Sequence, residues 1–405
     1  MANILLITDY YPPRKSIATN RMKAFEKYLS AAGHKVFVIT LGDKPACVVE
    51  NTTTVYYCTD NDWLKILDTN VKESAIRHYL KCAFNIAYSS VHTYSDSWVK
   101  NIIKTAREII GAQKIDVMIT SYPSIATMVA GEKIKELFPD IKWIMDMRDA
   151  VWTPNNNLFI RKRLVDITRS VAPGCDGLVA VSEPHIDRYR KVVKSAAQTV
   201  LITNGYDFDN PSVAITNKSD VFQIAFTGNF YGDLSPHNFF IALSKLIKER
   251  NITDIRFIVV GNHSVLNVPT AIKPFVSEID YMEYADLINY CADNINLLML
   301  VIPKSRERGI YTGKLFDYIG IGKPILGLVP KDDVAAALIK QAGNGYVAEN
   351  ENIEEIEEAI YAAYMDWKNN HIPSIDKNIQ RAYHRREQVA KLDNLISVLL
   401  EKDRM

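Results

Sequence analysis

The sequence is poor in the residues that cross-link small secreted domains or bind zinc. Only five of its 405 residues are cysteines, and no two of them form a C-x-x-C pair. They are Cys47, Cys58, Cys82, Cys175 and Cys291. An odd number of scattered cysteines argues against a disulfide framework and against a zinc site, and it fits a reducing compartment.

Long apolar runs and an excess of one charge are also missing. The first apolar run, Ile4–Ile7, is shorter than a signal peptide requires, and a membrane span needs about 20 apolar residues. The chain has 48 Lys and Arg against 47 Asp and Glu, so its net charge gives no attraction to nucleic acid. We therefore expect a cytoplasmic protein without a nucleic-acid partner.

Several catalytic motifs are absent. The sequence contains no G-x-S-x-G, no P-loop and no G-x-G-x-x-G, which argues against hydrolases, nucleoside triphosphatases and dinucleotide-binding enzymes. No cluster of His, Cys and carboxylates has metal-ligand spacing. We expect no metal and no cofactor.

Short apolar runs alternate with segments of helical period along most of the chain. In the first half, strands are expected at Ile4–Thr8, Lys35–Thr40, Asp116–Thr120, Lys142–Asp146, Gly177–Val181 and Thr199–Thr203, and a helix at Ile125–Leu137. Repetition of this kind predicts an α/β fold whose parallel sheet is covered on both faces.

The same alternation of apolar runs and helical segments resumes after a polar stretch, Asp207–Asp220. We expect an N-terminal Rossmann-like domain at 1–205, a second at 206–375, and a C-terminal helix at 376–405 that crosses back to the first. The segment Asp376–Lys402 is predicted to be one long charged helix. Because ligands of such sheets bind at the carboxyl ends of the strands, the two domains are expected to face each other across a cleft.

The strongest local motif is the segment Tyr311–Leu326. In this segment a polar loop precedes a short helix, which ends at Gly322 and is followed by a buried strand. Amide groups at such a helix start, together with the helix dipole, bind phosphate oxygens, and Lys314 adds a positive charge. Asp317 lies one turn further on the same face, where it can accept both hydroxyls of a ribose. Taken alone, the segment also fits a solvated Lys and Asp on an ordinary helix.

This segment resembles the donor-binding helix of glycosyltransferase family 4, a group within the GT-B fold. Further motifs resemble that family in the same order along nearly the whole chain. They are Asp9–Pro13 with Arg21 and Gly33–Val36, Thr120–Pro123, Asp146–Asp149 with Trp152, Val181–Glu183, Thr203–Gly205, Phe226–Asn229 and Val259–Gly261. Each motif is weak alone, but their order makes the resemblance specific.

The resemblance implies a donor site in the C-terminal domain and an acceptor site in the N-terminal one. The donor-binding residues would be Gly228, Asn229, Arg306, Glu307, Tyr311, Thr312, Gly313, Lys314 and Asp317. The acceptor-binding residues would be Tyr11, Arg14, Lys15, Ser121, Tyr122, Arg148 and Asp149. It also implies metal-independent transfer with retention, and no catalytic base can be identified.

The chain departs from the family pattern at three places. Where the family has the first of two glutamates, eight positions before Asp317, this chain has Gly309, and Glu307 stands two positions upstream. Arg14–Ser16 replaces a glycine pair, and Phe230–His237 lacks the usual lysine. Diphosphate binding would then depend mainly on Lys314 and on backbone amides.

The resulting hypothesis is a glycosyltransferase that moves a sugar from a nucleotide diphosphate donor to a saccharide or lipid-linked acceptor, in surface polysaccharide or glycan synthesis. Two alternatives remain open. A sugar-nucleotide epimerase could use the same fold, and so could a non-catalytic nucleotide-binding partner subunit.

A basic stretch rich in aromatic residues, Lys65–Arg107, and the cluster Arg161–Arg163 both lie in the first half. Such features let an enzyme rest on an anionic membrane, so we expect peripheral association with the inner face of the membrane. The alternative is a solvated face over a helical core.

Overall fold

The structure is a computed structural model of the whole chain. It describes residues 1–60, 93–151, 158–193, 197–209, 219–230, 232–261, 266–306 and 308–401. The chain forms two compact units, one made of Met1–Thr203 and Gln388–Met405 and the other of Asn204–Glu387. Each is described by itself below.

The first unit is built on an eight-stranded sheet in the order β3-β4-β2-β1-β5-β6-β7-β8. The strands are β1 (Asn3–Thr8), β2 (Lys35–Leu41), β3 (Ala46–Glu50), β4 (Thr53–Cys58), β5 (Val117–Tyr122), β6 (Lys142–Met147), β7 (Gly177–Ala180) and β8 (Gln198–Leu201). All pairs are parallel except β3 with β4. The sequence did not predict this antiparallel pair, because every residue of β3 is exposed and the strand has no buried face.

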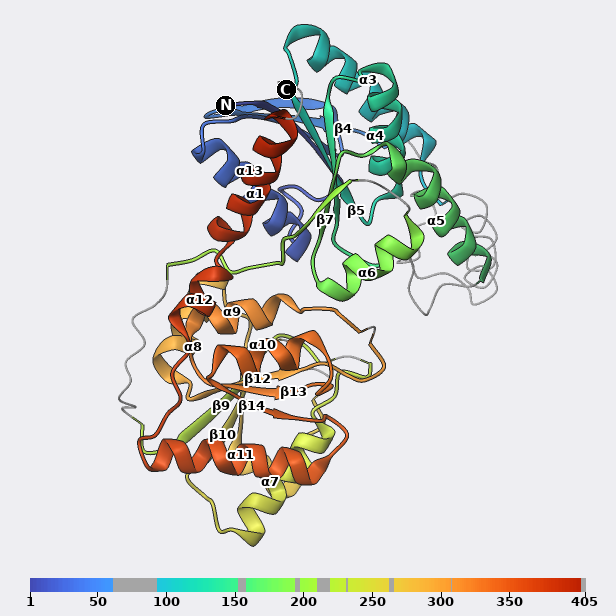
Figure 1. Cartoon of the computed structure of the whole chain (residues 1–405). Coiled ribbons are helices and arrows are strands. Elements are labelled where there is room, and N and C mark those ends of the chain that lie inside the picture. Colours follow the sequence, from blue (N-terminus) through green and yellow to red (C-terminus); the bar gives the residue numbers. More distant parts are fainter. Residues whose placement is uncertain are drawn as a thin grey trace, which may run out of the picture. The chain divides into compact units, whose positions relative to one another are not determined.

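Helices cover both faces of this sheet (Figure 1). They are α1 (Ile17–Ala31), α3 (Asp96–Ala112), α4 (Ile125–Leu137), α5 (Leu158–Val171), the 3-10 turn η2 (Ala172–Gly174), α6 (Glu183–Val192) and α13 (Arg385–Glu401). On one face α3, α4 and α6 pack around Trp98 and Trp143. On the other, Met22 of α1 and Leu392 of α13 pack against Ile4 and Leu6 of the central strand.

The second unit contains a six-stranded parallel sheet in the order β11-β10-β9-β12-β13-β14. The strands are β9 (Phe222–Thr227), β10 (Ile255–Val260), β11 (Val276–Ile279), β12 (Leu297–Val301), β13 (Ile325–Leu328) and β14 (Gly345–Ala348). On one side lie α7 (His237–Glu249), η3 (Thr270–Phe275) and α11 (Ile353–Lys368); on the other lie α8 (Tyr284–Asn294), α9 (Gly313–Ile321), α10 (Val334–Ala342) and α12 (Lys377–Ala382).

The prediction of one long C-terminal helix is wrong. The helix is broken at Tyr383, between α12 and α13. There the Tyr206 amide donates to the Tyr383 carbonyl at 3.2 Å, and the Arg385 amide donates to the Tyr206 carbonyl at 2.9 Å. The Tyr383 carbonyl and the Arg385 amide are backbone groups that a continuous helix would use for its own hydrogen bonds. Because they pair with Tyr206 instead, the helix is interrupted at this point.

Each sheet has a topological switch point, where neighbouring strands lead in opposite directions across the sheet. In the first unit it lies between β1 and β5, and in the second between β9 and β12. Open parallel sheets bind ligands at the carboxyl ends of the strands beside such a point. The loops after β1 and β5, and those after β9 and β12, are therefore the places to look for sites.

Candidate functional site

The start of α9 lies beside the switch point of the second unit. Thr312 precedes the helix with an extended backbone, and its side chain makes no capping hydrogen bond. Its hydroxyl oxygen Oγ1 is buried and has no partner in the described part of the chain. The first turn therefore presents the positive end of the helix dipole without a side-chain cap, which suits an anion.

Lys314 extends from this first turn across the end of β9. Its Nζ lies 4.1 Å from the ring centroid of Phe226. It also packs against Gly228, where a Cβ atom would come within 2.9 Å of Nζ. Gly228 has a φ of 104°, so this position needs glycine for both its conformation and its close contact. Within the described ranges, no carboxylate forms an ion pair with Lys314.

The surroundings of Lys314 disfavour its charge. Burial and the positive charge of Arg306 lower the pKa of Lys314 to about 8, although Asp317 opposes them. A buried cation without an ion-pair partner is costly, and a bound anion would remove that cost. Lys314 therefore stays mostly charged near physiological pH and is suited to bind phosphate.

Asp317 lies one turn further along α9. Its Oδ1 accepts a hydrogen bond of 2.6 Å from the Tyr284 hydroxyl at the start of α8. Burial raises the pKa of Asp317 to about 6, and the Tyr284 bond, Arg385 and Lys314 counteract this rise. Because one hydrogen bond does not exhaust a carboxylate, Asp317 can accept further donors such as ribose hydroxyls. Sequence reasoning missed Tyr284, since nothing in its local pattern points to Asp317.

Packing fixes the position of α9. The Tyr318 hydroxyl lies 3.0 Å from Thr227 Oγ1 and donates to the Met299 carbonyl at 3.3 Å, which ties the helix to β9 and β12. At its other end, Gln380 Nε2 donates to the Ile319 and Gly320 carbonyls, both at 3.0 Å. The first turn is therefore held rigidly at the sheet edge.

Gly309 occupies the place of the glutamate that the family resemblance would lead one to expect. Its backbone amide donates to Asp333 Oδ1 at 2.8 Å, and the same oxygen caps α10 through the Val334 amide at 2.8 Å. Arg308 next to it forms an ion pair with Asp332. Gly309 thus offers no carboxylate here, and its amide is held by Asp333, which fixes the loop.

The remaining predicted donor residues lie around this group. Asn229 follows Gly228 directly, Tyr311 packs its ring 5.4 Å from that of Phe316, and Arg306 contributes positive charge near Lys314. Glu307 lies outside the described residues. Gly261, which sequence reasoning did not assign to the site, ends β10 so close to Gly228 that a Cβ would lie 2.9 Å from its carbonyl oxygen.

The switch point of the first unit is organised around a buried ion pair. Arg21 and Asp146 are 3% and 0% exposed, and their side chains make two hydrogen bonds of 2.7 and 3.1 Å. Arg21 also donates to the Thr203 carbonyl at 2.8 Å. Ser121 adds a third bond to the carboxylate, at 3.2 Å. This network is closed and holds the strand ends together.

Three predicted acceptor residues lie beside this ion pair, Ser121 and Tyr122 at the end of β5 and Arg148 in the loop after β6. Arg148 Nε donates to Ser121 Oγ at 3.0 Å and to the Tyr122 carbonyl at 2.9 Å. The Tyr122 hydroxyl donates to the Ala150 and Val151 carbonyls, and burial raises its pKa above its usual range. Ser121 and Tyr122 are buried, so they orient Arg148 rather than face solvent.

The other predicted acceptor residues differ in exposure. Tyr11 is buried in the core beside Lys23, whereas Arg14, Lys15 and Asp149 are exposed. Of the predicted set, Arg14 and Arg148 both lie beside the ring of Tyr10.

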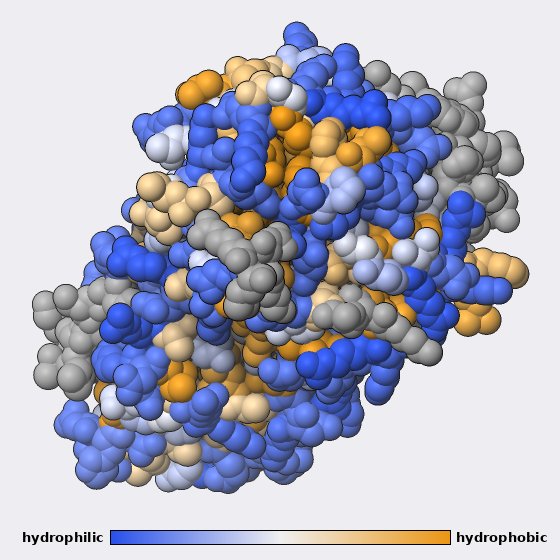
Figure 2. All heavy atoms as spheres, turned by 45° about the horizontal axis from the view of Figure 1, so that its top comes forward, coloured by the Kyte–Doolittle hydropathy of each residue, from blue (hydrophilic) through white to orange (hydrophobic). Residues whose placement is uncertain are grey.

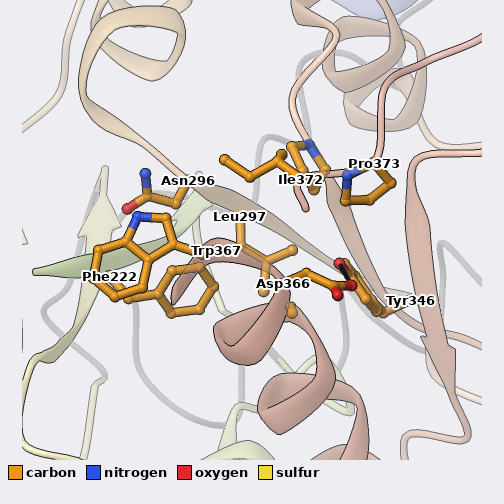
Figure 3. Close-up of a pocket in the computed structure, with 10 residues that line it drawn as sticks. Phe222, Asn296, Leu297, Tyr346, Asp366, Trp367, Ile372 and Pro373 are labelled. Atoms are coloured by element: carbon orange, nitrogen blue, oxygen red, sulfur yellow. Dashed lines mark hydrogen bonds between the residues drawn. The ribbon is translucent and has the colours of Figure 1, made fainter. Parts of the chain in front are cut away.

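A pocket lined by 10 residues lies at the amino ends of the strands of the second sheet, away from the start of α9 (Figure 3). Phe222, Leu297 and Tyr346 line it at the amino ends of their strands, together with Trp367. Its walls are mainly apolar, and the Tyr346 hydroxyl is already bonded to Asp366 Oδ2 at 2.7 Å. The pocket therefore lacks the free charges that the start of α9 provides.

Comparison with solved structures identifies the fold. No family model matches the sequence, and neither does any curated protein. A sucrose-phosphate synthase from Thermosynechococcus elongatus matches with a TM-score of 0.66 and 13% identity over 99% of this chain and 100% of that one. A glycosyltransferase from Rickettsia africae gives 0.60 and 17% over 99% and 96%.

A third match is an α,α-trehalose-phosphate synthase (UDP-forming) from Burkholderia xenovorans in complex with glucose-6-phosphate. Its TM-score is 0.63 at 9% identity, over 98% of this chain and 100% of that one. Identities this low establish the fold alone. The chain has the GT-B fold with two parallel-sheet units, as predicted. Membership of family 4 stays a prediction.

Proposed function

We propose that the protein is a glycosyltransferase that moves a sugar from a nucleotide diphosphate donor to a saccharide or lipid-linked acceptor, with retention. We place this reaction in surface polysaccharide or glycan synthesis. The proposal is supported by the GT-B fold, by the α9 site, and by similarity to glycosyltransferases including a UDP-forming synthase.

One observation carries the proposal. The start of α9 combines an uncapped helix terminus, the buried and unpartnered hydroxyl of Thr312, and Lys314 without an ion-pair partner in the described residues. All three favour a dianionic ligand. Asp317 lies one turn away, at a distance suited to the ribose of the same nucleotide.

The chemistry follows from where charge develops. As the bond between sugar and phosphate breaks, negative charge builds on the leaving β-phosphate. Amide groups at the α9 start and the Lys314 ammonium group would stabilise that charge without reorganising. In a front-face transfer, the leaving phosphate can take the proton of the acceptor hydroxyl, so the protein need not supply a base. We propose that no metal or cofactor participates.

Two rival functions use the same geometry. A sugar-nucleotide epimerase would consume the donor without an acceptor, and a non-catalytic partner subunit would bind the nucleotide and leave it intact. Gly309 in place of a side-chain carboxylate is mild support for the latter.

Donor consumption separates the three functions. Purified protein is incubated with nucleotide sugars, with and without saccharide or lipid-linked acceptors, and released nucleoside diphosphate and converted sugar are measured. A transferase releases nucleoside diphosphate only when an acceptor is present. Sugar conversion without acceptor would favour the epimerase, and binding without turnover under all conditions would favour the subunit.

We also propose that the first unit rests on the inner, anionic face of a membrane. No helix in the described parts of the chain is long and apolar enough to cross a bilayer. The molecular face seen in Figure 2 is mostly hydrophilic. At the start of α5, however, Leu158 and Phe159 are 77% and 80% exposed, directly before Arg161–Arg163. The stretch Lys65–Arg107 lies largely outside the described residues.

Vesicle co-sedimentation tests this surface. Each basic residue near an anionic bilayer contributes about 1 kcal/mol, and salt screens the attraction. The double variant Leu158→Ser/Phe159→Ser should sediment less with anionic vesicles than the wild type does, and high salt should release the wild type. Leu137→Ser, which removes an exposed leucine elsewhere in the unit, is the control. Equal partitioning to anionic and neutral vesicles would contradict the proposal.

A further inference from the structure

Two guanidinium groups lie beside one tyrosine ring at the switch point of the first unit. The loop after β1 carries Tyr10 and Arg14, and the loop after β6 carries Arg148. The guanidinium carbon of Arg148 lies 5.0 Å from the ring centroid of Tyr10, and that of Arg14 lies 5.6 Å from it.

Arg148 is oriented but not neutralised. Its Nε is fixed by Ser121 and by the Tyr122 carbonyl, at the end of β5. Its Nη2 is buried and has no hydrogen-bond partner among the residues that the structure describes. Burial lowers the pKa of Arg148, and the charges of Asp146 and Asp149 oppose this. A buried guanidinium N–H without a partner is unfavourable, which points to a missing acceptor group.

The neighbouring carboxylates do not fill this role. Asp146 already accepts two hydrogen bonds from Arg21 and one from Ser121. The side chain of Asp149 is exposed and forms no ion pair with Arg148 in the described structure. The protein thus fixes Nε of Arg148 on a closed network and leaves its Nη2 without an acceptor among the described residues.

We propose that Arg14 and Arg148, which we call the arginine pair, bind a phosphate group carried by the acceptor. The planar guanidinium of Arg148 offers a fork of N–H groups that matches a phosphate, and Arg14 supplies the second charge for a dianion. A neutral saccharide would offer these two groups no charge-assisted hydrogen bond. This inference rests on the proposed function, because it takes the ligand of the first unit to be the acceptor.

The test measures binding of inorganic phosphate by ³¹P NMR to the full-length Lys314→Ala variant, at constant ionic strength. This background removes the main cation of the donor site. We expect saturable binding that Arg148→Gln weakens about tenfold or more and Arg14→Gln about threefold to tenfold. Arg190→Gln, which removes an exposed arginine on α6 of the same unit, should leave it unchanged.

Each outcome of this experiment either supports or contradicts the proposal. Absent phosphate binding, or equal affinity in the Arg148→Gln and Arg190→Gln variants, would overturn the proposal. If Arg148→Gln lowers the melting temperature in chloride buffer, its effect on binding cannot be separated from its effect on folding. The Arg14→Gln variant then tests the proposal, because Arg14 is exposed. Failure of the donor proposal would give a different result. The wild-type protein would then bind no nucleoside diphosphate, while phosphate binding would still depend on Arg148.

The source of the phosphate is distinguished by two probes. Glucose 6-phosphate represents a soluble acceptor, and polyisoprenyl phosphate in phosphatidylcholine vesicles represents a lipid-linked one. Binding that requires Arg148 with either probe supports the proposal and identifies the source. If inorganic phosphate binds but both probes fail, the assignment of the arginine pair to the acceptor is contradicted.

Discussion

The switch points of the two sheets both lie at the carboxyl ends of parallel strands, but their charged groups are arranged differently. In the first unit the central charges, Arg21 and Asp146, satisfy each other in a buried network, and a ligand can meet only the groups above it. In the second unit, Lys314 lies beside Gly228 without an ion-pair partner among the described residues, next to an uncapped helix start. One site is closed by the protein itself, whereas the other needs a ligand to complete it.

The largest expected effect concerns the closed site. Arg21→Met leaves a buried carboxylate without its partner, so we expect the free energy of unfolding to fall by about 3–5 kcal/mol. The control is Lys23→Met, which removes a half-exposed ion pair with Glu26 on the same helix and should cost under about 1 kcal/mol. Denaturant unfolding measures both. Equal losses would mean that the Arg21–Asp146 pair is not a structural element.

A smaller effect is expected from closing the open site with a methyl group. In Gly228→Ala the new Cβ would displace Lys314, and nucleoside diphosphate affinity should fall at least tenfold, or about 1.4 kcal/mol. Gly232→Ala is matched, because Gly232 also has a positive φ but nothing lies within 4 Å of its Cβ position. Calorimetry should show unchanged affinity in that control. An unaffected Gly228→Ala would place the nucleotide elsewhere.

The pH dependence of nucleotide binding should also characterise the open site, because two of its groups have shifted pKa values. The pKa of Lys314 is about 8, so its charge, and with it the affinity for a nucleoside diphosphate, is lost as the pH rises through 8. The pKa of Asp317 is about 6, so its acceptor capacity is lost as the pH falls through 6. Affinity should therefore be greatest between these values.

The alkaline side of this profile is the diagnostic one, because the phosphate itself takes up a proton on the acid side. Lys314→Ala should bind more weakly but show no decline between pH 7 and pH 9. Titration calorimetry at several pH values checks this. A decline that persists in the variant would assign the titration to another group.

The smallest effect is expected from chelation. In the described part of the chain, no group of three or more His, Cys, Asp or Glu residues could hold a metal ion. If Lys314 and backbone amides stabilise the leaving phosphate, sugar transfer should continue unchanged in excess chelator. Activity that disappears with chelator and returns with Mn²⁺ or Mg²⁺ would contradict this mechanism.

Much of the fold could be predicted because its strands are buried on both faces. The helix Ile125–Leu137 was predicted with the boundaries that the structure has, and the predicted strands Lys35–Thr40 and Lys142–Asp146 end one residue short of β2 and β6. The exposed strand Ala46–Glu50 has no such pattern and was missed. The break at Tyr383 depends on a backbone contact with Tyr206, about 180 positions away, which no local pattern reports.

The candidate site was predictable to the extent that it lies in one segment. Thr312, Lys314 and Asp317 belong to a single loop and helix, so their spacing already suggested a phosphate and a ribose contact. Tyr284 reaches Asp317 from another helix, and Tyr10 lies beside Arg148 only after the sheet has formed. Sequence reasoning had no signal for either contact.

Calorimetric titration of wild-type protein with nucleoside diphosphates tests the central claim most directly, namely that the start of α9 holds the diphosphate. We expect one nucleotide per chain, with an affinity that Lys314→Ala lowers by about tenfold or more, as for one charge-assisted contact. Lys340→Ala, which removes an exposed lysine from α10 of the same unit, should leave the affinity unchanged. Unchanged affinity in Lys314→Ala would contradict the account.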